Sequence, residues 1–117
     1  MRHHSNIRTL SRTRRGRTAL IRGLAIALIN EGKIVTTTAK AKELRPFVES
    51  LVTFGKKGNI AGRRIVATRL GEPASAIVQK LFGEVAEKYK DREGGYTRIT
   101  KVGRNDAGRD ESVIEFV

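Results

Sequence analysis

The hydrophobic positions of the chain follow a helical period over most of its length and a strand-like pattern in three short segments. Apolar residues spaced by three and four positions predict helices over 13–31, 38–57, 60–70 and 74–90. Segments 33–38, 96–102 and 112–117 are rich in β-branched or alternating residues and predict strands. The order α-β-α-α-α-β-β indicates an α+β fold, with a small sheet of about three strands covered by a layer of helices.

Single residues predict where these elements begin and end. Thr13 is a suitable N-cap for the first helix, and Gly32 is suited to close it in a left-handed conformation. Thr37 or Thr38 caps the second helix, in which Pro46 predicts a kink or a break. The polar segment 103–111 is too long for a tight hairpin, so we expect the last two strands to pair antiparallel across a long loop.

The apolar faces identify the expected core. In the first helix this face contains Leu20, Leu24 and Leu28, while Arg15 and Arg22 lie on the opposite side. The buried stripe of the second helix consists of Ala41, Leu44, Val48, Leu51 and Gly55. A chain of 117 residues can bury a modest core of this kind.

The beginning of the chain is strongly basic. The 117 residues carry a net charge of +12, with 24 Lys and Arg against 12 Asp and Glu. The first thirty residues hold seven arginines and no acid, and the rest of the chain has a net charge of +5. Because residues 1–12 also lack apolar periodicity, we predict a basic N-terminal arm at 1–12 and a single globular domain at 13–117. A soluble protein with this charge is expected to bind nucleic acid, and an anionic membrane is the other candidate.

The residues that could carry catalysis do not form a recognisable site. Acidic residues are spread singly, and no nucleophile–base or phosphate-loop motif is present. The chain has no cysteine, and His3 and His4 are adjacent without a local carboxylate, which makes a poor metal site. We therefore predict a protein that is not an enzyme and has no catalytic residues, metal, cofactor or small-molecule substrate.

Three other interpretations are less favoured. The longest apolar run, Leu24 to Ile29, is far shorter than the ~20 residues of a spanning helix. The Arg-rich, acid-poor beginning also suits a mitochondrial presequence, but the first helix runs into a strand without a linker. An amphipathic helix lying on a membrane would need the same apolar stripe that the core requires.

Several motifs in sequence order resemble one known family. They are segments 1–3 (MRH), 34–37 (IVTT), 39–46 (AKAKELRP), 89–92 (YKDR) and 94–99 (GGYTRI), together with the leucine-rich first helix. The chain resembles the family of bacterial large-subunit ribosomal protein number seventeen. This resemblance implies a structural ribosomal component in the cytoplasm that binds the long ribosomal RNA of the large subunit. It also implies neighbouring ribosomal proteins near the outer end of the exit tunnel, and a small mixed sheet with an N-terminal extension buried in RNA.

The candidate RNA-binding residues are mainly the cations of the arm and of the polar helix faces, because an arginine fork pairs well with phosphate. Tyr96 is included as a possible base-stacking residue, although an aromatic at a strand start more often packs in the core. The full set is Arg2, His3, Arg8, Arg12, Arg14, Arg15, Arg17, Arg22, Lys40, Lys42, Arg45, Lys56, Lys57, Arg63, Arg64, Arg92, Tyr96 and Arg98. An architectural DNA-binding protein is the alternative, although no dimer seam or recognition-helix motif is evident.

Overall fold

The computed structural model of the protein describes residues 10, 12–73 and 75–117, and it confirms the α+β class and the predicted order of elements. The helical elements are α1 (Arg14–Glu31), α2 (Thr38–Lys57), α3 (Ile60–Arg69), α4 (Ser75–Lys80), the π-helical segment η1 (Leu81–Val85) and α5 (Ala86–Lys88). The strands are β1 (Lys33–Thr37), β2 (Thr97–Arg104) and β3 (Asp110–Phe116).

The helix ends follow the capping chemistry of the sequence. The Thr13 side chain accepts a hydrogen bond from the Gly16 amide at 3.2 Å, and Gly32 closes α1 with a φ of 84°. The Thr37 side chain caps α2. This helix continues through Pro46 without a break. Proline has no amide to donate to the Lys42 carbonyl, but both residues are exposed, so water can reach that carbonyl.

The described strands form an antiparallel sheet in the order β1-β3-β2. The predicted pairing of the last two strands is confirmed, but the mixed sheet implied by the family resemblance is corrected to an antiparallel one. The physical reason is that β3 is the central strand. The chain reverses between β2 and β3, so these two strands are antiparallel, and β1 pairs antiparallel with the other edge of β3.

The connection between β2 and β3 is shorter than predicted. Ladder pairing continues to Arg104 and Asp110, so the loop contains residues 105–109 instead of 103–111. The Asn105 side chain makes this loop compact, because its Oδ1 accepts hydrogen bonds from the amides of Ala107 and Arg109 at 2.9 and 3.0 Å. A bulge near Gly103, which has a φ of 117°, shifts the register.

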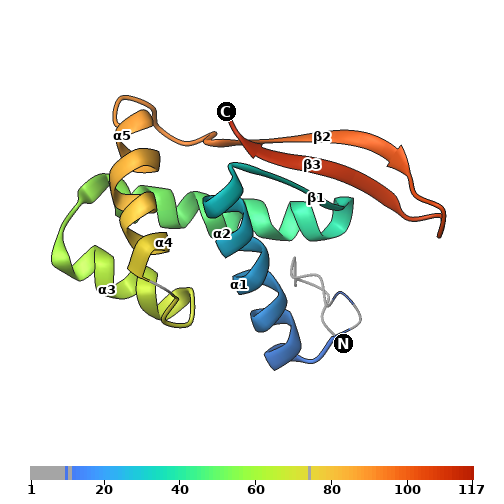
Figure 1. The fold of residues 1–117 in the computed structure, drawn as a ribbon, viewed down its shortest axis with the longest axis horizontal. Helices are drawn as coiled ribbons and strands as arrows, with labels where there is room; N and C mark the ends of the chain where they lie inside the picture. Colours follow the sequence, from blue (N-terminus) through green and yellow to red (C-terminus); the bar gives the residue numbers. More distant parts are fainter. Residues whose placement is uncertain (1–9, 11, 74) are drawn as a thin grey trace, which may run out of the picture.

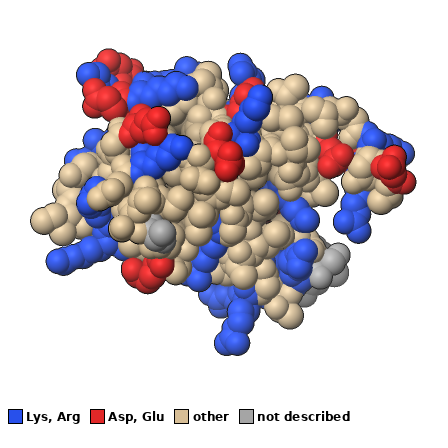
Figure 2. Space-filling view, viewed as in Figure 1, with Lys and Arg blue, Asp and Glu red and all other residues tan. Residues whose placement is uncertain are grey.

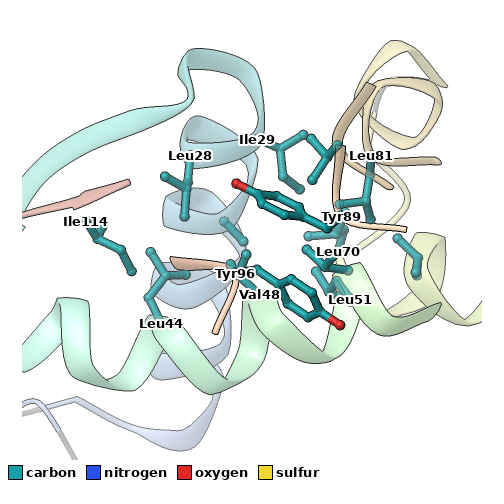
Figure 3. Packing of buried hydrophobic residues seen from close by; sticks show 14 of the residues in the cluster. Leu28, Ile29, Leu44, Val48, Leu51, Leu70, Leu81, Tyr89, Tyr96 and Ile114 are labelled. Carbon is teal, nitrogen blue, oxygen red and sulfur yellow. The ribbon is translucent and has the colours of Figure 1, made fainter. Parts of the chain in front are cut away.

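Helix α2 is the central element of the fold (Figure 1). The sheet lies over its N-terminal part, α1 crosses it on the opposite side, and α3, α4 and α5 lie around its C-terminal part. The predicted stripe of α2 is confirmed, since all five of its residues are buried. Figure 3 shows the core around it, in which Tyr89 and Tyr96 lie among aliphatic side chains with their hydroxyls pointing in opposite directions.

The last helical run was predicted over 74–90, and it contains a π-helical segment that periodicity did not reveal. This segment packs closely on α2 at Gly55, where an added Cβ would lie 3.4 Å from the Leu81 carbonyl oxygen and 3.5 Å from the Ala86 Cβ. A single methyl group at position 55 would already reach van der Waals contact with Leu81 and Ala86. Ala74, the first residue of this predicted helix, lies outside the described residues.

Candidate nucleic-acid interface

The beginning of α1 presents arginines that have no acidic partner. Arg12, Arg14 and Arg15 are exposed and are here called the α1 basic surface. Among the residues that the structure describes, no acid lies within ion-pair distance of these three side chains, and none occurs in α1 before Glu31. Lys and Arg surround this part of the molecule in the space-filling view (Figure 2). The predicted residues Arg2, His3 and Arg8 lie outside the described residues.

The next two predicted arginines of α1 make contacts within the protein. Arg17 donates from Nη1 to the Arg12 carbonyl at 3.2 Å. Arg22 donates from Nε to the Arg69 carbonyl at 2.9 Å and from Nη2 to the Thr68 carbonyl at 3.3 Å. The carbonyls that Arg22 contacts lie at the end of α3, where the helix leaves such groups without intrahelical partners. Arg22 thus bridges α1 and α3, and its contact with RNA stays a prediction.

A second cationic region surrounds the beginning of α2. One groove there is lined by Arg12, Lys40 and Arg109, and a neighbouring groove by Lys42, Arg45 and Lys101. The structure thus brings together three predicted residues of α2 with Arg12. It also adds Lys101 and Arg109, which the sequence interpretation did not include.

The candidates near the other end of α2 are more often engaged by the protein itself. Lys56 donates to the Tyr96 hydroxyl at 3.0 Å and to the Arg92 carbonyl. Lys57 lies over the Phe54 ring at 5.7 Å, and the Arg63 guanidinium lies over the Phe82 ring at 5.2 Å. Lys57, Arg63, Arg64 and Arg92 are nevertheless exposed. The predicted cations therefore do not form one site, because α2 separates the two groups (Figure 1).

Two predicted residues at the start of β2 are engaged within the protein; the base-stacking role of Tyr96 is corrected, and the RNA contact of Arg98 stays a prediction. Tyr96 is only 2% exposed, and its ring packs 5.3 Å from that of Tyr89, so it cannot stack on a base. The hydrogen bond from Lys56 lowers the pKa of the Tyr96 hydroxyl. Arg98 donates from Nε and Nη2 to the Glu115 carboxylate at 3.1 and 2.8 Å, and this hydrogen bonding lowers the pKa of Glu115. Arg98 thus forms an ion pair with the neighbouring strand β3.

Other kinds of site find little support in the described part of the chain. No cluster of three or more His, Cys, Asp or Glu residues suited to a metal ion occurs among residues 10, 12–73 and 75–117. Within the same residues, no helix is long and apolar enough to cross a membrane.

The comparisons with known proteins agree with the resemblance seen in the motifs. A family model described as "Ribosomal protein L17" matches residues 20–117. A protein of Sphingopyxis alaskensis named "Large ribosomal subunit protein bL17" is 50% identical over 118 residues, covering 100% of this chain and 84% of the relative. Proteins with the same name in Persephonella marina and Staphylococcus haemolyticus are 49% and 48% identical; they cover 100% and 94% of this chain, and 95% and 97% of the relatives. The chain therefore belongs to the ribosomal protein L17 family.

Proposed function

We propose that the protein is a structural constituent of the large ribosomal subunit in the bacterial cytoplasm, where it binds ribosomal RNA and stabilises its folded structure. Relatives that align with the whole chain are named as proteins of that subunit. The observation that carries the RNA-binding part of the proposal is the α1 basic surface, in which arginines are exposed without acidic partners among the described residues.

The position of these arginines is itself an argument for a polyanionic ligand. Arg14 and Arg15 occupy the first turn of α1, where the helix dipole is positive and acidic residues would be stabilising. The first turn contains no acid, so like charges accumulate where the helix favours them least. A phosphate backbone removes this repulsion, and each guanidinium can pair with phosphate through two hydrogen bonds.

The proposal assigns different roles to two parts of the chain. Residues 1–12 act as the RNA-binding arm, and residues 13–117 act as the folded unit that positions it. The Thr13 cap supports this boundary, because α1 begins directly after Thr13 and the helix contributes Ala25, Leu28 and Ile29 to the core. The segment before Thr13 is therefore joined to a helix that is anchored in the core.

Neighbouring large-subunit proteins near the exit tunnel belong to the same proposal. It is supported by the relatives that align with the whole chain, which are named as proteins of the large subunit.

The test is a deletion of residues 2–12, which leaves the Thr13 cap of α1 in place. We expect the truncated protein to unfold cooperatively but to be depleted from large subunits isolated by sedimentation from cells that also contain the full-length chain. Full-length protein should also lose RNA affinity by orders of magnitude between roughly 50 and 200 mM salt, as the release of counterions from about six contacted phosphates requires.

The outcomes separate the proposal from its alternatives. Equal sedimentation of the truncated and full-length chains with large subunits would refute the role of the arm. Stronger competition by duplex DNA than by structured RNA would favour the architectural DNA-binding alternative. Flotation with anionic liposomes, at salt concentrations where RNA binding is lost, would favour a membrane-surface protein.

A further inference from the structure

The beginning of α2 is joined to the strand pair β2–β3 by a pair of hydroxyls. The Thr38 Oγ1 and the Ser112 Oγ share a hydrogen bond of 2.7 Å, and Thr38 also donates to the Asp110 carbonyl at 3.4 Å. Thr38 lines both grooves described above, so the two grooves lie on either side of this junction. The junction therefore fixes the first turn of α2 relative to the strands, and it fixes the cations that each element carries.

The strand pair contributes one cation to each groove. Lys101 on β2 faces the groove that contains Lys42 and Arg45, and Arg109 faces the groove that contains Arg12 and Lys40. Arg109 is held in place by the loop, since its amide donates to the Asn105 side chain at 3.0 Å and its carbonyl accepts from the Asn105 amide at 2.9 Å. Both side chains are exposed. The backbone that carries Arg109 is thus fixed before any ligand arrives.

The acids of this region are already engaged by other residues. Asp110, which lines the first groove, pairs with Arg104 at 3.2 Å. Glu49 pairs with Arg45 at 3.4 Å and accepts a hydrogen bond from Thr97 at 2.7 Å. Among the described residues that line the two grooves, Lys40, Lys42, Lys101 and Arg109 make no ion pair. Both grooves therefore keep an excess of positive charge.

We propose that the first turns of α2 and the strand pair β2–β3 form one surface for the sugar–phosphate backbone of folded RNA, with Lys101 and Arg109 binding phosphates beside Lys40 and Lys42. The described residues that line the grooves include no aromatic side chain, so this surface recognises charge and shape rather than stacked bases. The inference rests on the proposed RNA-binding function, and it adds to the α1 basic surface a contact from the opposite end of the sequence.

The experiment uses the full-length chain and deproteinised large-subunit ribosomal RNA. We compare the double variant Lys101→Gln/Arg109→Gln with the control variant Lys88→Gln/Lys90→Gln, which removes the same charge at and just beyond the end of α5, outside both grooves. Affinity is measured over a salt series. Loss of two phosphate contacts should weaken binding by a factor of ten or more near 0.1 M salt and lower the slope of log affinity against log salt by about two.

The charge-restoring variant Lys101→Arg/Arg109→Lys should bind like the wild type, which separates loss of charge from damage to the strands. If the Gln variants of the strand pair and of the control have the same affinity and the same salt slope, the inference is overturned. If the wild-type chain itself does not bind the RNA, the proposed function is refuted as well. Failure of the proposed function is thus distinguished from failure of the inference alone.

Discussion

The α1 basic surface and the outer face of the sheet are both rich in cations, but they use them differently. On the sheet, the register places Lys33 and Arg98 on either side of Glu115, and Arg98 forms an ion pair with that carboxylate at 2.8 Å. At the start of α1, Arg14 and Arg15 have no acid nearby among the described residues. The pairing of charges therefore distinguishes cations that support the fold from cations that are available to a ligand.

The energetic consequences of the two arrangements are opposite. Exposed ion pairs such as Arg98–Glu115 are screened by solvent and salt, so they stabilise the strands only slightly. Arginines at the N-terminus of a helix oppose its dipole and destabilise it by about 0.3–1 kcal/mol each at low salt. The α1 basic surface thus weakens the isolated protein, and we infer that it is favourable only when phosphate compensates it.

The largest expected effect comes from removing the unpaired charges. Arg14→Gln/Arg15→Gln should weaken binding to large-subunit ribosomal RNA by roughly fiftyfold near 0.1 M salt, because two phosphate contacts are lost. It should also raise the thermal stability of the free protein slightly, since the repulsion with the helix dipole disappears. A salt series of binding measurements and a thermal unfolding curve check the two parts.

The matched control for this prediction removes two charges that are already paired. Lys90→Gln/Arg98→Gln takes away the same net charge but breaks the ion pairs with Glu87 and Glu115. We expect a change in RNA affinity of less than about threefold, the effect of net charge alone. If the two double variants lose affinity equally, the distinction between paired and unpaired cations is wrong.

Much of the fold could be predicted because its signals are local. Thr13 and Gly32 bound α1 through capping chemistry, and the stripe from Ala41 to Gly55 follows from helical periodicity alone. The resemblance in the motifs identified the family that the comparisons then showed. The continuation of β2 and β3 to Arg104 and Asp110 was missed, because it depends on the bulge near Gly103 and on the Asn105 side chain, which only a folded loop brings into place.

The candidate site was predicted less completely, because the role of a cation depends on what folding places beside it. Arg15 and Arg22 have the same residue type and lie on the same predicted face of α1. Folding leaves Arg15 exposed, whereas it places Arg22 against the end of α3, 47 residues further along the chain. Lys101 could not be linked to α2 until the Thr38–Ser112 hydrogen bond was known. Long-range contacts of this kind carry no signal in a single sequence.

A smaller effect, on stability instead of binding, is expected at Arg22. Arg22→Gln removes the donors to the Arg69 and Thr68 carbonyls and should lower the free energy of unfolding by about 1–2 kcal/mol. Arg15→Gln is the control on the same helix; it should not lower the free energy of unfolding and should raise it by up to about 1 kcal/mol at low salt. Urea denaturation measures both. If Arg22→Gln is as stable as the control but binds RNA more weakly, Arg22 is an RNA contact after all.

The smallest effect concerns the Arg98–Glu115 ion pair and depends on pH. The hydrogen bonds from Arg98 hold the pKa of the Glu115 carboxyl below its ordinary value in the folded protein. The ion pair therefore contributes stability above the pKa of the unfolded chain, and this contribution is lost as the pH falls through the lower pKa of the folded state. An NMR titration of the Glu115 carboxyl carbon should show its midpoint rising in Arg98→Gln and remaining unchanged in Arg104→Gln, since Arg104 pairs with Asp110 instead. A midpoint that does not move in Arg98→Gln would mean that Arg98 is not held by Glu115 in solution, and Arg98 would then rejoin the cations available to RNA.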